Sequence, residues 1–101
     1  MKTLIVGGVD GVLIGPYDLS GSCGMPGKLD HPEVVQAVQT VLDACKRHRK
    51  SAGIHLVHPT PERISSLISQ GFTFLALGVD LIFLQQGAAA ALDSARQAAA
   101  R

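Results

Sequence analysis

The sequence has few aromatic side chains and little net charge. Aromatic residues make up 4% of the 101 residues and charged residues 17%, whereas 47% are hydrophobic. This length and composition fit one soluble globular unit whose core is built from aliphatic side chains. The formal net charge of +1 gives no reason to expect nucleic acid or an anionic membrane as a partner.

Long hydrophobic runs and a paired cysteine motif are also missing. The apolar runs are short and broken by Gly, Asp or Pro, so none is typical of a transmembrane helix. Residues 1–6 contain one Lys and too short an apolar stretch for a secretory signal, which predicts a cytoplasmic protein. Cys23 and Cys45 lie far apart without a CxxC pattern, which predicts reduced thiols, with Cys45 buried on a helix face.

Apolar segments of strand length alternate with helical patterns along the chain. We expect strands near residues 9–14, 52–57 and 72–77, and residues 4–6 are also apolar enough for a strand. Residues 21–27 carry three glycines and a proline, which predicts a loop. Strands that alternate with helices predict right-handed crossovers and a parallel sheet.

The helix that follows this loop has a defined predicted start and a buried face. Asp30 is the expected cap, with Pro32 in the first turn and Glu33 closing a capping box. The basic run 46–50 ends the helix, where its positive charge complements the helix dipole, and phosphate binding is the alternative. The buried stripe is expected to comprise Val34, Val38, Val41, Leu42 and Cys45.

Two further helices are predicted from the residues at their ends. One starts at Thr60 as its cap, continues with Pro in the first position and stops at Gly71. The other is alanine-rich and covers residues 81–101, with Asp80 as its cap and an interruption at Gly87. The apolar face of the first of these helices comprises Ile64, Leu67 and Ile68.

A sheet of only three parallel strands leaves both of its edges and one of its faces uncovered. Buried parallel strands need cover on both faces, so Ile54, Phe72 and Phe74 would be exposed and would promote aggregation. The sequence therefore predicts either a homo-oligomer, in which the open edges or faces meet, or a chain of marginal stability.

Residues 8–19, GVDGVLIGPYDL, contain the strongest candidate for a functional residue. The expected strand passes into a Gly-Pro turn, and Asp18 follows that turn. Ligands bind at the carboxyl ends of parallel strands, and we expect Asp18, His58 and Asp80 to lie at that common edge. The alternative is that Asp18 only starts a turn or caps a short helix.

Two histidines, His55 and His58, are candidates for metal ligands because they lie three residues apart. Positions three apart on a strand point to opposite faces, so joint coordination requires a bend at residues 57–58. His58 precedes a proline and is more simply explained as a loop residue. Asp10 is expected to fix the start of its strand.

Several motifs, taken together, resemble a known family. In chain order they are GVDGVLIGPYDLSGSCG, HPEV, AGIHLV and GFTFLALGVDLIFL, and they cover the chain from Gly8 almost to its end. They resemble the carboxyl-terminal part of the HpcH/HpaI family of metal-dependent pyruvate aldolases. The resemblance implies an α/β fold of three consecutive strand–helix units from a (β/α)8 TIM-type barrel, with parallel strands and an incomplete barrel. Residues 1–101 then form a single partial domain, and residues 1–7 are an atypical start.

The resemblance also implies a reaction and a cofactor. The family cleaves 4-hydroxy-2-oxo acids to pyruvate and an aldehyde, using a divalent metal, Mg, Mn or Co, that stabilises the enolate. Asp18 matches a metal-binding carboxylate of the family. Gly15, Pro16 and Tyr17 match a turn that receives the carboxylate of the 2-oxo acid through the N–H groups of Gly15 and Tyr17. His55 matches a position that faces the substrate pocket. For Asp10 and Asp80, a place in the family's pocket architecture is the alternative to their roles at the start of a strand and of a helix.

The family's other metal-binding Glu, its substrate-binding Arg and its catalytic His lie on earlier strands that this sequence does not contain. We therefore assign no catalytic residue in this chain, and Asp18 alone is expected to hold a metal weakly or not at all. The expectation is a fragment of an aldolase that is inactive in isolation. The alternative is a non-catalytic remnant that self-associates or docks on a complete homologue.

Overall fold

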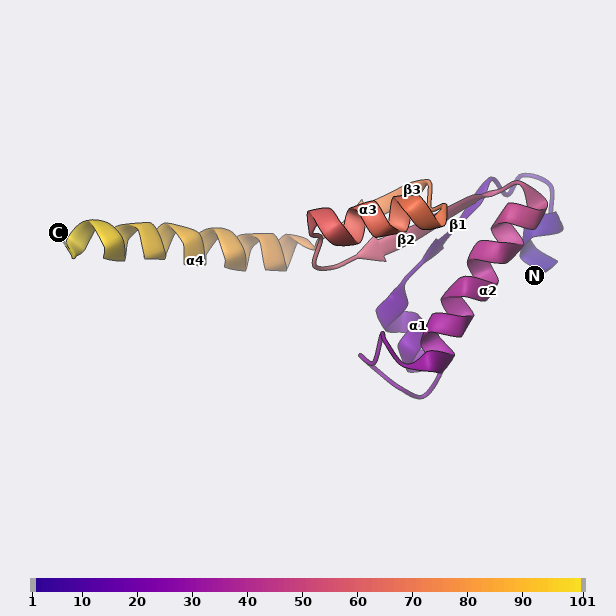
Figure 1. Cartoon of the computed structure of the whole chain (residues 1–101), viewed down its shortest axis with the longest axis horizontal. Coiled ribbons are helices and arrows are strands. Elements are labelled where there is room, and N and C mark those ends of the chain that lie inside the picture. The colour runs from indigo at the N-terminus through magenta and orange to yellow at the C-terminus, as the bar shows by residue number, and fades with distance from the viewer. Residues whose placement is uncertain (1, 101) are drawn as a thin grey trace.

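The computed structural model describes residues 2–100 as an α/β chain in which strands and helices alternate (Figure 1). A short 3-10 helix comes first, and the last α-helix is the longest element. In chain order the elements are η1 (Lys2–Ile5), β1 (Gly11–Ile14), α1 (Pro16–Ser22), α2 (Pro32–His48), β2 (Ser51–Leu56), α3 (Pro61–Gln70), β3 (Phe74–Leu77) and α4 (Asp80–Ala99).

The three strands form one open sheet in the order β1-β2-β3, and both pairings are parallel. The register places Ile14 beside Ile54 and Ile54 beside Leu75. The prediction of three parallel strands joined through helices is therefore confirmed. Because the strands are parallel, their carboxyl ends meet at one edge of the sheet, and Asp18, His58 and Asp80 each follow one of those ends.

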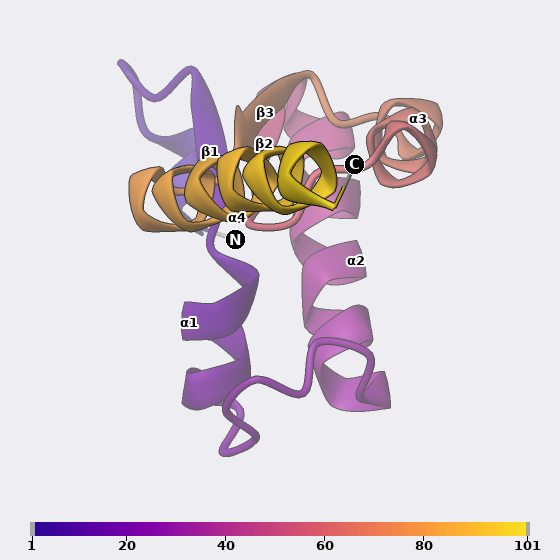
Figure 2. The same cartoon turned by 90° about the vertical axis from the view of Figure 1, so that its left-hand side faces the viewer.

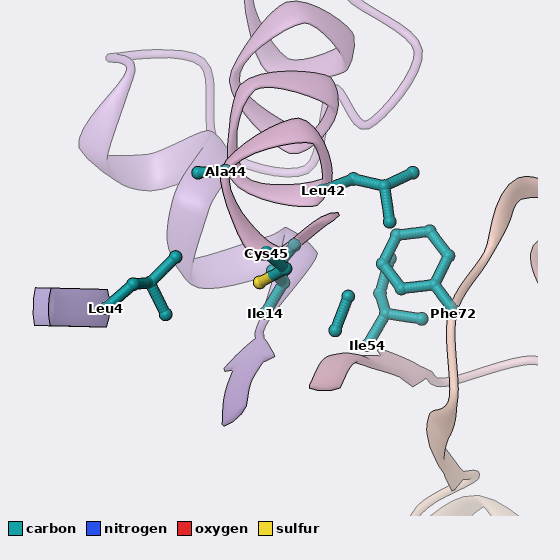
Figure 3. Close-up of a cluster of buried hydrophobic side chains, with 8 residues drawn as sticks. Leu4, Ile14, Leu42, Ala44, Cys45, Ile54 and Phe72 are labelled. Atoms are coloured by element: carbon teal, nitrogen blue, oxygen red, sulfur yellow. The ribbon is translucent and has the colours of Figure 1, made fainter. Parts of the chain in front are cut away.

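One face of the sheet packs against α2 and forms the core. The predicted stripe on α2 is confirmed: Val34, Leu42 and Cys45 are fully buried, and Val38 and Val41 pack beside the core. Burial raises the pKa of the Cys45 thiol, which favours the protonated form. Figure 3 shows the core side chains, which are Leu4, Ile14, Leu42, Ala44, Cys45, Ala52, Ile54 and Phe72.

The prediction that Ile54 and Phe72 would be exposed is wrong. Both are buried, because they belong to the cluster that includes Leu42 of α2. Phe74 does remain 54% exposed, and it lies on the opposite face of the sheet together with Leu13, which is 50% exposed. Between them in the register lies Gly53, where an added Cβ would be 3.1 Å from Leu13 Cδ1 and 3.2 Å from Phe74 Cβ. Leu13, Gly53 and Phe74 therefore form one row across the three strands, half-exposed at Leu13 and Phe74 and buried at Gly53.

Helix α4 points away from the rest of the molecule (Figures 1 and 2). The chain measures 62 × 27 × 22 Å, and Leu81 and Leu84 of α4 are 70% and 71% exposed. The predicted interruption at Gly87 is wrong, since α4 continues through it. The run of four alanines that follows it, residues 88–91, offsets the cost of about 1 kcal/mol that one glycine adds to a helix. No helix within residues 2–100 combines the length and the hydropathy that a membrane crossing requires.

Residues 4–6 do not form the predicted strand. Leu4 belongs to η1 and is buried against the core, whereas Ile5 and Val6 are exposed. The 3-10 turn lets Leu4 pack on the core as a single anchor. The glycine-rich loop begins later than predicted, because Gly21 and Ser22 still belong to α1.

The predicted helix ends are confirmed for α3 and shifted by one residue for α2 and α4. Thr60 accepts a hydrogen bond from the Arg63 N–H, and Gly71 ends α3 with a φ of 110°. The cap of α2 is His31, whose Nδ1 accepts from the Glu33 N–H, and not Asp30, because the proline in the first helical position makes the preceding residue the cap.

Helix α4 likewise begins one residue from its predicted cap. Val79 is the N-cap, and Asp80 is the first helical residue, with its carboxylate accepting from the Leu81 N–H. The basic run at the end of α2 has an additional contact, since Lys46 Nζ donates to the Gln70 carbonyl at the end of α3 over 2.8 Å. Positive charge at this position complements the negative end of α3.

Candidate functional site

The carboxyl end of β1 leads directly into α1. Gly15 is the N-cap of α1 and Pro16 is its first residue, a position where the missing N–H of proline costs nothing. Asp18 therefore lies in the first turn of α1, so it neither starts a turn nor caps the helix as the alternative expectation had it. A carboxylate in the first turn interacts favourably with the helix dipole.

The Asp18 carboxylate folds back over the start of its own helix. A Cβ built on Gly15 would lie 3.0 Å from Asp18 Oδ2. Any side chain at position 15 would therefore crowd this carboxylate. Gly15 leaves room for Asp18 to reach the edge of the sheet, and Asp18 itself is exposed to solvent.

The first turn of α1 also presents backbone donors. The first hydrogen bond of the helix runs from the Leu19 N–H to the Gly15 carbonyl at 2.9 Å. The N–H groups of Tyr17 and Asp18 precede it and have no partner within the helix. A carboxylate and unpaired N–H groups thus lie within one turn of helix at the carboxyl end of β1.

Ser20 shapes this region and was not singled out from the sequence. Its side chain is completely buried. The Ser20 hydroxyl donates to the Tyr17 carbonyl at 2.6 Å and accepts from the Gly27 N–H at 2.9 Å, which ties the glycine-rich loop to α1. A serine next to a glycine-rich segment is too common a pattern to identify such a contact from the sequence.

We expect Ser20→Ala to destabilise the chain by about 1–3 kcal/mol, because the Gly27 N–H loses its partner in a partly buried place. Ser22→Ala is the matched control, since Ser22 is exposed in the same helix. Urea unfolding of the two variants measures the difference. Equal midpoints for both would contradict the anchoring role of Ser20.

His55 lies near the end of β2 and His58 follows that strand, and their environments differ. His55 is partly buried, and its Nε2 lies 2.7 Å from the Gly78 carbonyl. His58 is exposed in the bend that follows β2, where its carbonyl accepts from Arg63 Nη1 at 3.1 Å. Within residues 2–100, no group of three or more His, Cys, Asp or Glu side chains is arranged to hold a metal. Asp18 is thus a single carboxylate, and these residues alone do not make a complete metal site.

An open cavity of about 540 Å³ lies at the same edge of the sheet. It brings together residues from α1, the glycine-rich loop, the end of β2 and α3, and its lining is Tyr17, Gly27, Leu29, Asp30, Leu56, His58 and Arg63. Of the residues predicted for the site, Tyr17 lines this cavity, whereas Gly15, Pro16, Asp18 and His55 do not.

The parallel strand–helix units with polar residues at the carboxyl edge of the sheet define part of a TIM-barrel α/β protein. The chain belongs to the HpcH/HpaI aldolase/citrate lyase family, which matches residues 2–86. A pyruvate aldolase of Rhizobium etli is 45% identical over 85 residues, covering 84% of this chain and 33% of that protein. A 5-keto-4-deoxy-D-glucarate aldolase of Klebsiella pneumoniae is 40% identical over 74 residues, covering 73% of this chain and 28% of that protein.

The fold agrees with solved structures of the same family. A HpcH/HpaI aldolase/citrate lyase family protein from Burkholderia cenocepacia superimposes with a TM-score of 0.85 at 27% identity, covering 94% of this chain and 36% of that one. The chain thus spans about a third of the length of the relatives it matches. The open sheet of residues 11–77 is therefore the arrangement that these strands have within a complete family member.

Proposed function

We propose that this chain supplies the carboxyl-terminal strand–helix units of a metal-dependent aldolase that cleaves 4-hydroxy-2-oxo acids to pyruvate and an aldehyde. The observation that carries the proposal is the Asp18 carboxylate, folded back over Gly15 at the carboxyl end of β1 with free N–H groups beside it. Membership of the aldolase family and relatives named as pyruvate aldolase and 5-keto-4-deoxy-D-glucarate aldolase support the reaction class.

Each residue of the β1–α1 junction has a role in this proposal. Asp18 is one ligand of a divalent cation such as Mg, Mn or Co, which prefers oxygen ligands. The N–H groups of Gly15 and Tyr17 receive the carboxylate of the 2-oxo acid, while Pro16 fixes the direction of the turn. His55 faces the bound 2-oxo acid from the neighbouring strand β2, although it is not part of the lining of the cavity described above.

The remaining ligands have to come from outside residues 2–100, because Asp18 is a single carboxylate. A hard cation held by one carboxylate keeps most of its waters and binds weakly. The complete protein is proposed to act in the cytoplasm on a small 2-oxo acid and to be a homo-oligomer. The half-exposed row of Leu13 and Phe74 and the apolar residues of α4 support association.

A second candidate function is a non-catalytic module that acts by self-association. It is favoured by the exposure of Leu81 and Leu84 on a helix that leaves the body of the molecule. The two candidates differ in the role of Asp18, since only the aldolase requires the negative charge of its carboxylate.

We expect the purified 101-residue chain to release no measurable pyruvate from 4-hydroxy-2-oxo acids with added Mg or Mn, because one carboxylate is not a metal site. The same chain joined behind the upstream strand–helix units of the Rhizobium etli relative should release pyruvate in an EDTA-sensitive reaction. Turnover by the 101-residue chain that EDTA abolishes would refute the need for the upstream units. A folded fusion without turnover would exclude the aldolase and favour the self-associating module.

A further inference from the structure

The open cavity of about 540 Å³ at the carboxyl edge of the sheet collects polar residues from separate segments of the chain. Tyr17 comes from α1, Asp30 from the segment before α2, His58 from the bend after β2 and Arg63 from α3. A volume of about 300–1,000 Å³ with a few polar groups on its wall is typical of small-molecule sites. Apart from Tyr17, the residues assigned above to the metal and the 2-oxo acid do not line this cavity, so their chemistry does not account for it.

Two polar contacts hold the walls of the cavity in place. The fully buried Ser20 hydroxyl donates to the Tyr17 carbonyl at 2.6 Å and accepts from the Gly27 N–H at 2.9 Å. On the other side, Arg63 Nη1 donates to the His58 carbonyl at 3.1 Å. All four of the residues joined in this way line the cavity. The walls are therefore fixed before a ligand arrives, which lowers the cost of ordering them on binding.

Arg63 gives the cavity a group that binds carboxylates. Its contact with the His58 carbonyl uses Nη1, and no other hydrogen bond of this guanidinium is found within residues 2–100. Most of its N–H groups are therefore available to a ligand. The planar guanidinium matches a carboxylate with two parallel hydrogen bonds, and the contact with His58 restricts its orientation.

Asp30 gives the same cavity a hydrogen-bond acceptor of opposite charge. The sequence predicted that its carboxylate caps α2, but His31 is the cap, so Asp30 does not have that role. In the part of the chain that the structure describes, Asp30 and Arg63 are not hydrogen-bond partners, although both line the cavity. An ionised carboxylate can only accept, so Asp30 requires a donor from the ligand.

We propose that this cavity binds a small carboxylic acid that carries a hydroxyl or ammonium group beside its carboxylate. Arg63 holds the carboxylate of the ligand, and Asp30 accepts a hydrogen bond from its hydroxyl or ammonium group. The apolar part of the lining, Leu29 and Leu56, accommodates the carbon chain. Binding at this site does not require the aldolase activity proposed above.

The test titrates the 101-residue chain with D-glycerate, L-serine and propionate, which have carbon chains of the same length. Two-dimensional proton–nitrogen NMR should show saturable shifts at the amides of Gly27, His58 and Arg63. D-glycerate or L-serine should bind at least about tenfold more tightly than propionate, because propionate has the carboxylate but no donor for Asp30. Whichever of the two binds more tightly identifies the donor as a hydroxyl or an ammonium group.

Two substitutions separate the two charged groups. Arg63→Gln should weaken the binding of all three acids by at least about tenfold, because it removes the charge that holds their carboxylate. Asp30→Asn should lower the preference over propionate by about fivefold, because hydrogen bonds to a charged group are roughly twice as strong as neutral ones. Repulsion between Asp30 and the ligand carboxylate cancels in this ratio, since all three acids share that carboxylate. The matched controls are Arg96→Gln and Asp93→Asn, both exposed on α4, and they should bind as the parent chain does.

A purely structural role for Arg63, which would only hold the bend after β2, makes a different prediction. Asp30→Asn does not touch the contact between Arg63 and His58, so a lowered preference together with unchanged amide exchange in residues 57–60 supports the ligand site. The proposal is overturned if the parent chain shows no saturable shifts at the cavity or binds all three acids equally. An unchanged preference in Asp30→Asn, or equal losses in the α4 controls, also overturns it. The absence of turnover in the protein completed with upstream units would refute the aldolase and leave this binding result intact.

Discussion

Asp18→Asn in the protein completed with upstream units should abolish metal-dependent turnover, with a loss of at least about 100-fold. The amide keeps the shape of the side chain but removes the negative charge that a hard cation requires. Binding of Mn, followed by electron paramagnetic resonance, should weaken together with turnover. These two measurements test the ligand role from independent directions.

Stability provides the contrast for Asp18→Asn. The carboxylate is exposed in the first turn of α1, so its interaction with the helix dipole is worth about 0.3–1 kcal/mol, and the thermal midpoint should hardly change. Asp80→Asn is the matched control, because Asp80 is also exposed in the first turn of a helix at the same edge. It should leave turnover intact. Retained turnover in Asp18→Asn would mean that the β1–α1 junction has only a structural role.

Gly78→Ala should disrupt the junction between β3 and α4. Gly78 has a φ of 76°, which costs a residue with a Cβ about 1–3 kcal/mol, and the added Cβ would overlap the ring of Phe83. Amide hydrogen exchange should therefore accelerate in the first turns of α4 and in β3. The unfolding midpoint in urea should fall as well.

Gly87→Ala should have the opposite effect and serves as the control. Gly87 lies inside α4 with open space around the position of a Cβ, so alanine should stabilise the helix by about 0.5–1 kcal/mol. Slower exchange in the middle of α4 would confirm it. If both glycine variants shifted exchange in the same direction, the crowding at Gly78 would not control the junction.

Signals confined to a few neighbouring residues allowed much of the fold to be predicted. Thr60 and Gly71 bound α3 as expected because a cap and a left-handed stop each depend on local backbone geometry. The alternation of strand-length apolar segments with helical patterns predicted the parallel strands, because a helix between two strands returns the chain so that the next strand runs in the same direction. The cap of α2 was displaced from Asp30 to His31, since the position of the proline outweighs the preference of the side chain.

Features that depend on distant packing were not predictable. Leu4 was predicted as part of a possible strand. It packs instead against core side chains that come from later in the chain, and residues 4–6 alone give no sign of that contact. Ile54 and Phe72 were expected to be exposed because the sequence does not show which face of the sheet α2 packs against. In the structure both side chains are buried in the cluster that includes Leu42 of α2. At the site, the order strand, glycine, proline and Asp18 was sufficient to predict a carboxylate at the end of β1.

The contact of His55 with Gly78 has a different origin. The two residues are 23 positions apart, and they meet because β2 and β3 pair in a register that aligns Leu56 with Leu77. A shift of one residue would move every side chain of a strand to the other face. The resemblance to a family therefore indicated that His55 faces a pocket, but only the register identifies the atom that binds it.

The projection of α4 changes how the molecule behaves hydrodynamically. The radius of gyration is 17.7 Å, whereas a compact chain of about 100 residues has roughly 13 Å. By the same scaling, 17.7 Å corresponds to a compact protein of roughly 240 residues. A single copy in this shape would thus elute from a gel-filtration column close to where a compact dimer is expected, and sedimentation equilibrium, which depends on mass alone, would tell the two apart.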